Sequence, residues 1–249
     1  MKRAIVIGAS SGIGREVCSL LLADGWTVGV AARREELLAE IKKLRPDLVE
    51  VMRIDVTAAD APARLLSLAG RLGGVSLFVY CAGIGRQNMQ LDGTIEQATA
   101  DVNVKGFTVM LDTMFNYMAE RHGGDIAVIS SIAGTKGLGA APSYSASKAY
   151  QTTYIQALEQ LSNMRHLHIR FTDIRPGFVD TPLLAGGRGY PMLMDVKSVA
   201  RDLVKAVYAH RHVRVIDWRY RILVAIWRMI PKWLWRKMNV VNRKSVKIE

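Results

Sequence analysis

Short apolar runs rich in β-branched residues recur along the chain and alternate with segments of helical periodicity. These runs occupy residues 4–7, 27–31, 49–54, 77–81, 126–129, 169–174 and 213–216. Near-continuous apolar strands separated by helices are typical of a parallel sheet that is covered on both faces. The pattern therefore predicts an α/β fold, with a doubly wound parallel sheet of about seven strands flanked by helices on both faces.

The strand and helix pattern runs through most of the chain without a linker. No Pro/Ser-rich boundary, low-complexity run or internal repeat interrupts the 249 residues. Hydrophobic residues make up 50% and charged residues 22%, as in an ordinary folded enzyme. We therefore expect a single domain over residues 1–249, with a basic, Trp-rich C-terminal extension at about 218–249.

The cysteines and histidines give no sign of a disulfide framework or a metal site. Cys18 and Cys81 fall in apolar surroundings that indicate core positions. No metal-binding spacing links the histidines in polar, basic stretches, which are His166, His168, His210 and His212. The apolar run after Arg3 is far too short for a signal peptide. We expect a cytoplasmic protein whose chemistry uses no metal.

A glycine-rich turn follows the first apolar run and opens a helical segment at residues 12–24. Its glycines permit a tight turn and a close backbone approach, and the N–H groups of a helix N-terminus attract a pyrophosphate. The spacing G-x-x-x-G-x-G differs from the common dinucleotide fingerprint, and a turn without a ligand stays open as an alternative. The candidate cofactor contacts here are Gly8, Ser10, Ser11, Gly12, Ile13 and Gly14.

Two arginines stand at the end of the second predicted strand. A carboxylate normally binds the ribose 2′-hydroxyl of NAD at this place, roughly 20 residues beyond the glycines. Here Ala32 is followed by Arg33 and Arg34, and a pair of guanidinium groups suits a 2′-phosphate. The sequence therefore predicts NADP(H) in preference to NAD(H). Arg15, in the first helix, is either a further phosphate contact or a solvated side chain.

Tyr144 and Lys148 stand four residues apart, and Tyr144 follows Ser131 by thirteen residues. Residues four apart lie on one face of a helix, so the Lys148 ammonium can lie beside the Tyr144 phenol and favour its ionised form. A phenol that gives and takes a proton near neutral pH is a general acid/base. Alone, such a pair also fits a solvated helix face.

Taken in order, seven residues resemble the motifs of the short-chain dehydrogenase/reductase family over about residues 1–210: Gly8, Gly12, Gly14, Asn103, Ser131, Tyr144 and Lys148. Asp55-Val56 resembles the family's adenine contact. The segment from Arg175 to Thr181 resembles the one that closes on the nicotinamide carboxamide, with Pro176, Gly177, Val179 and Thr181 as contacts. The resemblance implies a Rossmann-type fold.

One departure from the family pattern is visible. Tyr80-Cys81-Ala82-Gly83 replaces the family's Asn-Asn-Ala-Gly after the fourth strand. Ala82 and Gly83 keep the close backbone approach to the cofactor. We expect the change to alter strand packing more than chemistry, and we do not expect Cys81 to act as a nucleophile.

The resemblance also implies a reaction, a hydride transfer between NADP(H) and a carbonyl or alcohol. Tyr144 would protonate the carbonyl oxygen, or take the proton in the reverse direction. Lys148 would lower the pKa of Tyr144 and hold the nicotinamide ribose hydroxyls. Ser131, favoured over its neighbour Ser130 by strand alternation and by its spacing from the tyrosine, would hydrogen-bond the carbonyl oxygen.

Asn103 would use its amide to hold a water in a proton relay toward Lys148. The family resemblance further implies a homodimer or homotetramer. The alternative is a non-catalytic NADP(H)-binding regulatory or interaction protein on the same fold, because fold does not fix function.

A glycine-rich segment with Leu and Met side chains, residues 182–194, is typical of a substrate-binding loop. Apart from Arg188 it holds no charge aimed at a phosphate or carboxylate, so it favours an apolar ketone, aldehyde or alcohol. A mobile surface loop with ordinary core contacts is the alternative.

The net charge of +12 belongs to the C-terminal part of the chain. Residues 201–249 hold thirteen Lys/Arg and three Asp/Glu, a net charge of +10, whereas residues 1–200 carry only +2. Residues 218–249 mix four tryptophans with these basic residues, which suits a helix at the surface of an anionic membrane. Packing on the domain, the substrate pocket or a second subunit is the alternative. Without a recognisable nucleic-acid motif, we expect no nucleic-acid binding.

Overall fold

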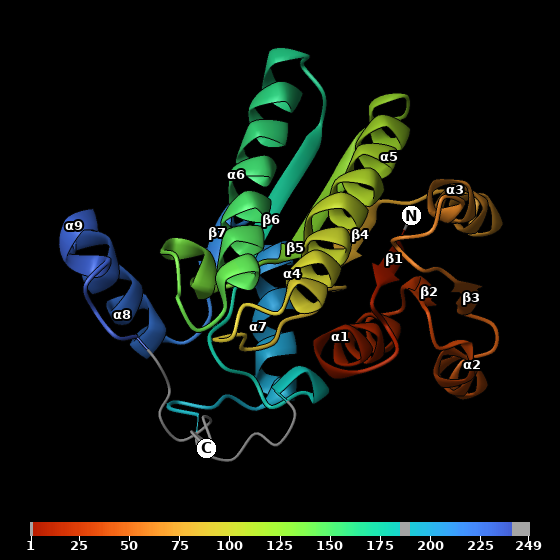
Figure 1. Ribbon diagram of the computed structural model, residues 1–249. Helices are drawn as coiled ribbons and strands as arrows, with labels where there is room; N and C mark the ends of the chain where they lie inside the picture. Colours follow the sequence, from red (N-terminus) through yellow and green to blue (C-terminus); the bar gives the residue numbers. More distant parts are fainter. Residues whose placement is uncertain (1, 185–189, 241–249) are drawn as a thin grey trace.

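The computed structural model describes residues 2–184 and 190–240. Its seven strands form one parallel sheet in the order β3-β2-β1-β4-β5-β6-β7 (Figure 1). The strands are β1 (Arg3–Ile7), β2 (Thr27–Ala32), β3 (Val49–Arg53), β4 (Leu77–Tyr80), β5 (Gly124–Ile129), β6 (Ile169–Arg175) and β7 (Val213–Val215). Each apolar run predicted from the sequence forms a strand, and the doubly wound parallel sheet is confirmed.

Helices cover both faces of the sheet because strand side chains alternate between the faces. In β1, Ala4 and Val6 join one core with α1 (Gly12–Ala23), α2 (Glu35–Leu44) and α7 (Val196–Tyr208). Ile5 and Ile7 join the opposite core, which is closed by α3 (Ala61–Arg71), α5 (Phe107–Ala119) and α6 (Pro142–Met164). The sheet is therefore the middle of three layers.

The strand order reverses beside β1, which pairs with β2 on one side and with β4 on the other. Crevices at such a reversal, outside the carboxyl ends of the strands, bind ligands in open α/β sheets. The chain segments that leave β1, β4 and β5 meet there. The fold thus brings together the strand ends at which the glycine turn and the segment before Tyr144 begin.

Three short helical segments lie near this edge. Between α4 (Gly93–Ala100) and α5 the chain widens into a π-helical turn, η1 (Asp101–Gly106), which contains Asn103. Such turns are rare and occur frequently at functional sites. The other two are 3₁₀ turns, η2 (Ile132–Thr135) directly after Ser131 and η3 (Pro182–Leu184).

The C-terminal extension folds into two helices, α8 (Trp218–Met229) and α9 (Lys232–Trp235), which project from one side of the molecule (Figure 1). Tyr220 and Val224 of α8 are buried in the same core as α7. Packing on the domain, the alternative to membrane contact, therefore holds for one side of α8. Among the described residues no helix is long and apolar enough to cross a membrane.

Candidate active site

The glycine turn is pressed against the end of β4. Gly8 has a φ of +85°, and a Cβ there would lie 2.8 Å from the Ala82 backbone nitrogen. A Cβ on Gly14 would lie 2.3 Å from the carbonyl oxygen of Gly8. Only glycine fits such contacts, and the turn stands at the N-terminus of α1, whose N–H groups attract an anion. This local geometry fits a pyrophosphate, as the sequence predicted.

Arg34 lies across the serines of the turn. Its Nη2 donates hydrogen bonds to Ser10 Oγ and Ser11 Oγ, each at 3.0 Å. Ala32 ends β2, so no carboxylate stands at the strand end. Arg15, in contrast, forms an exposed ion pair with Glu40 at 3.2 Å, an arrangement closer to the solvated reading of this residue.

Arg33 and a third arginine surround the end of β3. Arg53 Nε donates to the Arg33 carbonyl oxygen at 3.3 Å. Partial burial raises the pKa of Asp55, but hydrogen bonds from Thr57 and the charges of Arg33 and Arg53 outweigh this and lower it. Val56 beside it is buried against Gly106. Arg53 was not predicted, because it becomes a neighbour of Arg33 only through the pairing of β2 with β3.

Ser131 and Tyr144 come together at the end of β5. Ser131 caps η2 in an extended conformation, with Oγ accepting from Ala133 N at 3.1 Å and donating to the Pro176 carbonyl at 3.4 Å. Packing around the Tyr144 phenol raises its pKa, and a hydrogen bond with Ser131 acts in the opposite direction. Ser130 points the other way, where its hydroxyl hydrogen-bonds buried Asp173.

Lys148 lies on the same helix, with its ammonium 5.9 Å from the centre of the Tyr144 ring. Nζ donates to the Ile129 carbonyl at 3.0 Å and to Gln151 Oε1 at 2.9 Å. Burial lowers the Lys148 pKa to about 8, although Asp173 and Cys81 act to raise it. The sequence predicted that Lys148 lowers the Tyr144 pKa. In the structure, burial raises the pKa of this phenol.

Asn103 is held by the backbone after β4. Its Oδ1 accepts from Ile84 N at 2.9 Å, while Nδ2 donates to the Ile84 carbonyl at 2.7 Å and to Ser147 Oγ at 3.1 Å. The backbone carbonyl of Asn103 accepts from Gln151 Nε2 at 2.9 Å. The Gln151 side chain thus joins the Asn103 backbone carbonyl to the Lys148 ammonium, and the water predicted at the Asn103 amide stays a prediction.

Two glycines let the segment after β4 pass beside α6. A Cβ on Gly85 would lie 2.4 Å from the Tyr144 ring, and one on Gly83 would lie 3.6 Å from Lys148 Nζ. The segment after β4 therefore packs against the side chains of Tyr144 and Lys148. Gly85 and Gln151 are functional candidates that the sequence reasoning missed. The spacing of Gln151 from Lys148, one helical turn, is a signal that could have found it.

The segment from Pro176 to Thr181 lies over the glycine turn. A Cβ on Gly12 would lie 3.3 Å from the Thr181 side chain, and Thr181 Oγ1 donates to the Val179 carbonyl at 3.3 Å. Buried Val179 forms an isolated parallel bridge with Met194, which ties this segment to the far end of the predicted substrate loop. The structure thus brings the two predicted segments together.

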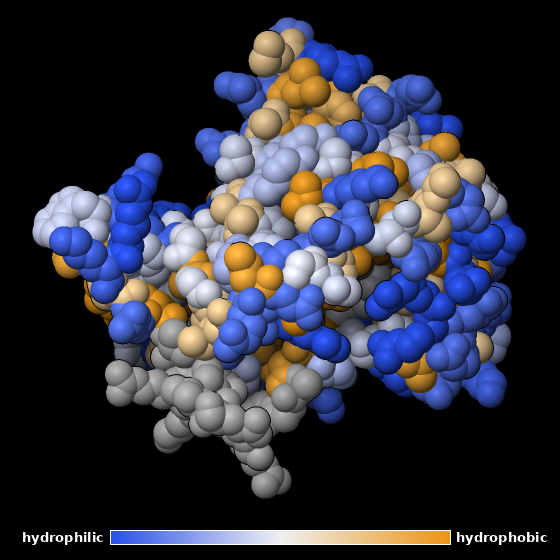
Figure 2. All heavy atoms as spheres, viewed as in Figure 1, coloured by the Kyte–Doolittle hydropathy of each residue, from blue (hydrophilic) through white to orange (hydrophobic). Residues whose placement is uncertain are grey.

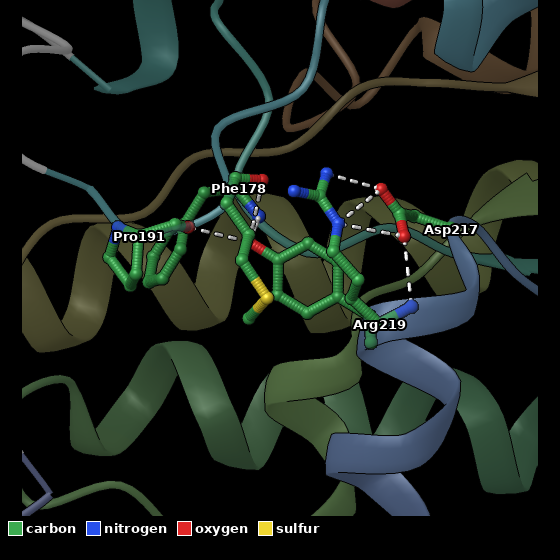
Figure 3. A network of polar contacts seen from close by, with 6 residues as sticks. Phe178, Pro191, Asp217 and Arg219 are labelled. Atoms are coloured by element: carbon green, nitrogen blue, oxygen red, sulfur yellow. Dashed lines mark hydrogen bonds and ion pairs between the residues drawn. The ribbon is translucent and has the colours of Figure 1, made fainter.

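Tyr220 of α8 joins the segment before that loop to the end of the loop, at Phe178 and Pro191, which Figure 3 labels. Its hydroxyl accepts from Phe178 N at 3.1 Å and lies 2.9 Å from the Pro191 carbonyl and 3.2 Å from the Met192 carbonyl. A Cβ on Gly177 would lie 2.2 Å from its ring. Nothing local in the sequence marks Tyr220, which is 42 residues from Phe178. The middle of the loop, 185–189 with Arg188, lies outside the described residues.

The predicted surface histidines are exposed: His166, His168, His210 and His212. Cys18 is buried, and burial raises the pKa of the partly buried Cys81 thiol to about 12. A thiol with so high a pKa is a poor nucleophile at neutral pH. Within residues 2–184 and 190–240, no group of three or more His, Cys, Asp or Glu side chains is placed to hold a metal ion.

A doubly wound parallel sheet with a glycine turn and a Ser-Tyr-Lys set at its carboxyl edge defines a class of nucleotide-dependent oxidoreductases. The short chain dehydrogenase family model matches residues 2–188. The chain therefore belongs to the short-chain dehydrogenase/reductase family, whose members are oxidoreductases that bind a nicotinamide cofactor.

Relatives and solved structures agree with this assignment. The chain is 31% identical to an uncharacterized oxidoreductase from Myxococcus xanthus, over 92% of this chain and 93% of the relative. It is 32% identical to one from Staphylococcus saprophyticus, over 86% of this chain and 94% of the relative. A short chain dehydrogenase from Burkholderia cenocepacia, solved in complex with NADP, has a TM-score of 0.78 at 22% identity and covers 90% of this chain and 91% of its own. The similarity to this last structure shows that the two chains share a fold.

Proposed function

We propose that the protein transfers a hydride between NADP(H) and an apolar ketone, aldehyde or the corresponding alcohol. The observation that carries this is the meeting of Ser131 with the Tyr144 phenol, one helical turn from Lys148 and beside the glycine turn. When bound, the nicotinamide supplies or accepts the hydride. The glycine turn, with no room for a Cβ at Gly8 or Gly14, supports a pyrophosphate at its backbone.

The chain's own residues move the proton and position the reacting oxygen. Tyr144 donates its phenolic proton to the carbonyl oxygen during reduction and takes it back during oxidation. Ser131 Oγ donates a hydrogen bond to that oxygen as negative charge develops on it. The Lys148 ammonium, charged below its pKa of about 8, acts against the burial that raises the Tyr144 pKa, and it binds the ribose hydroxyls of the cofactor.

Removing the phenolic hydroxyl tests this assignment. We expect Tyr144→Phe to lower kcat by roughly a hundred- to ten-thousand-fold while NADPH binding, followed by fluorescence titration, stays near that of the parent protein. Lys148→Ala should weaken both turnover and cofactor binding. Near-normal turnover by Tyr144→Phe would overturn the mechanism, and binding without any turnover by the parent protein would favour the regulatory alternative.

The preference for NADP(H) rests on Arg33 and Arg34. Arg34 bridges Ser10 and Ser11, Arg33 lies beside Arg53, and β2 ends without a carboxylate. A cluster of guanidinium groups suits a 2′-phosphate. We expect Arg33→Ala with Arg34→Ala to raise KM for NADPH at least about tenfold with little change for NADH. Equal or better efficiency with NADH in the parent protein would contradict the preference.

The substrate class follows from the loop. Its described ends carry exposed Leu183 and Leu193, which suits an apolar carbonyl. An NADPH-oxidation screen across ketones and aldehydes, with steroid and long-chain carbonyls included, would name the class. We further propose a single domain over residues 1–249 that assembles as a homodimer or homotetramer, which light scattering after gel filtration would measure.

A further inference from the structure

Only one side of α8 packs on the rest of the protein. Tyr220 and Val224 are buried, and Leu223 and Trp227 are partly buried. Residues spaced three and four apart share one helix face, so these four side chains form a single continuous side. That side accounts for all the contacts that α8 needs to fold against the domain.

The opposite side of α8 is apolar as well, and it is exposed. Trp218, Ile222, Ile226 and Met229 are 64%, 52%, 52% and 82% exposed, and the same periodicity places them together away from the buried side. On α9 and just beyond it, Trp233, Leu234 and Met238 are exposed too. We call these seven side chains the outer apolar surface of α8–α9. A surface helix with one packed side has no need of a second apolar side.

Basic side chains border the outer apolar surface. Arg221 and Arg228, two turns apart, lie along one margin of its α8 part, and Arg219 lies along the other. α9 and its end add Lys232, Arg236 and Lys237, all exposed. Asp217 pairs with Arg219 at 2.6 Å (Figure 3), and no acidic residue occurs in the sequence from 218 to 248. In Figure 2, hydrophilic residues (blue) lie beside hydrophobic ones (orange) over α8 and α9. The surface is therefore apolar at its centre and positive at its rim.

The two helices are fixed in place. Lys136 Nζ donates to the Ile230 carbonyl at 2.9 Å, and Trp235 Nε1 donates to the Gly137 carbonyl at 2.7 Å. The Trp227 and Trp235 rings pack edge to face, with centres 5.2 Å apart. These bonds hold α8 and α9 against the segment between η2 and α6, so the outer apolar surface is presented as a preformed unit.

We propose that the outer apolar surface of α8–α9 docks on an anionic lipid bilayer. Its apolar side chains, two tryptophans among them, would enter the interfacial region, and the arginines and lysines would meet anionic headgroups. A second copy of this chain would bring two positive surfaces into contact, which like-charge repulsion disfavours. Charge complementarity therefore selects the anionic bilayer as the occupant.

Docking at this surface would also orient the site. Tyr220 lies on the opposite side of the same helix and holds Phe178, which precedes the predicted substrate loop, and Pro191 and Met192 within that loop. The two opposite sides of α8 thus contact the proposed bilayer and the predicted substrate loop. This goes beyond the proposed hydride transfer and stands without it.

Vesicle binding by the full chain tests the proposal. The probes are sedimenting vesicles of phosphatidylcholine alone and vesicles that also contain phosphatidylglycerol, at low and high salt, without cofactor or substrate. One variant, Ile222→Ser with Ile226→Ser, removes apolar surface and keeps the charge. A second, Arg221→Gln with Arg228→Gln, removes charge and keeps the apolar surface. The matched controls change exposed residues elsewhere: Leu44→Ser with Leu66→Ser, and Lys43→Gln with Arg71→Gln.

We expect the parent protein and both controls to bind the anionic vesicles, and binding to weaken with salt. Each α8 variant should lower the partition coefficient at least about tenfold. Unchanged thermal unfolding would show that the variants fold. Undiminished binding by the Ile222→Ser, Ile226→Ser variant would overturn the proposal. Failure of the parent protein to bind either kind of vesicle would also overturn it. A third contrary result would be self-association of the parent protein, measured by light scattering, that the Ile222→Ser, Ile226→Ser variant abolishes.

Discussion

Gln151 links Lys148 to Asn103 through two hydrogen bonds, and the predicted water at Asn103 stays a prediction. It is fully buried, and its amide joins the Lys148 ammonium to the Asn103 carbonyl. An amide that is hydrogen-bonded at both ends has little freedom to reorient, so it holds the ammonium in one position. The residue-scale consequence is that the protonation of Lys148 depends on Gln151 as well as on burial.

Gln151→Leu should move the loss of activity at high pH to lower pH. Oε1 stabilises the charged ammonium, so its removal lowers the Lys148 pKa below its present value of about 8, whereas Asp173 and Cys81 still act to raise it. The charged form is then lost earlier as the pH rises, by about one pH unit. The pH profile of kcat/KM measures this. Gln151→Glu should shift the same limb upward, and an unmoved limb in both variants would contradict the role.

Tyr80→Phe should leave stability unchanged or raise it by up to about 1 kcal/mol. Tyr80 is fully buried and packs edge to face on Phe107, with ring centres 5.3 Å apart. In the described part of the chain its hydroxyl is a buried group without a hydrogen-bond partner, so the hydroxyl adds a desolvation cost and no bond. Urea unfolding gives the difference, and a loss above about 1 kcal/mol would show a hidden partner.

At the scale of elements, α8 and η1 add contacts that the family motifs do not include. η1 widens the helix at Asn103, so that its backbone carbonyl is available to Gln151 of α6. α8 supplies Tyr220 to the segment that leaves β6. η1 thus positions Gln151 beside Lys148, and α8 positions the segment that contains Phe178.

Tyr220→Phe should lower the free energy of unfolding by roughly 1–3 kcal/mol, in contrast to Tyr80→Phe. The ring stays in place over Gly177, but Phe178 N loses its acceptor and the 191–192 carbonyls lose their donor. We also expect KM for the carbonyl substrate to rise more than KM for NADPH. Urea unfolding and steady-state kinetics measure the two effects, and equal stabilities for the two Tyr→Phe variants would contradict the anchoring role.

At the scale of the whole molecule, α8 contributes to the same core as α7. Deleting residues 218–249 should destabilise the protein by more than about 3 kcal/mol, because it uncovers the core beneath Tyr220, Val224 and Trp235. Calorimetry or urea unfolding measures the loss. A truncated chain of undiminished stability would show that α8 only rests on the surface. Substitutions on the outer face are therefore the cleaner way to separate membrane contact from folding.

The sequence could predict the sheet and most of the local motifs, and it missed what long-range packing decides. Continuous apolar runs such as Ala4–Ile7 identify buried parallel strands by themselves. The pKa of Lys148 depends on a burial that no local pattern reveals, and Tyr220 reaches Phe178 only through the complete fold. The sequence showed that residues 218–249 are apolar and basic, but it did not show which side of α8 is exposed. The reason is that both sides of this short helix carry apolar residues.

The central place of β1 in the sheet has a consequence for how the chain acquires its structure. β1 leaves the ribosome before both of its neighbours, and one of them, β4, begins only beyond Ser76, which is 73 residues from Arg3. Closing so long a loop is slow, and until it closes an apolar strand edge stays unpaired. The nascent chain is therefore most exposed to aggregation before β4 emerges, and a chaperone that shields β1 during that interval would raise the yield of folded protein.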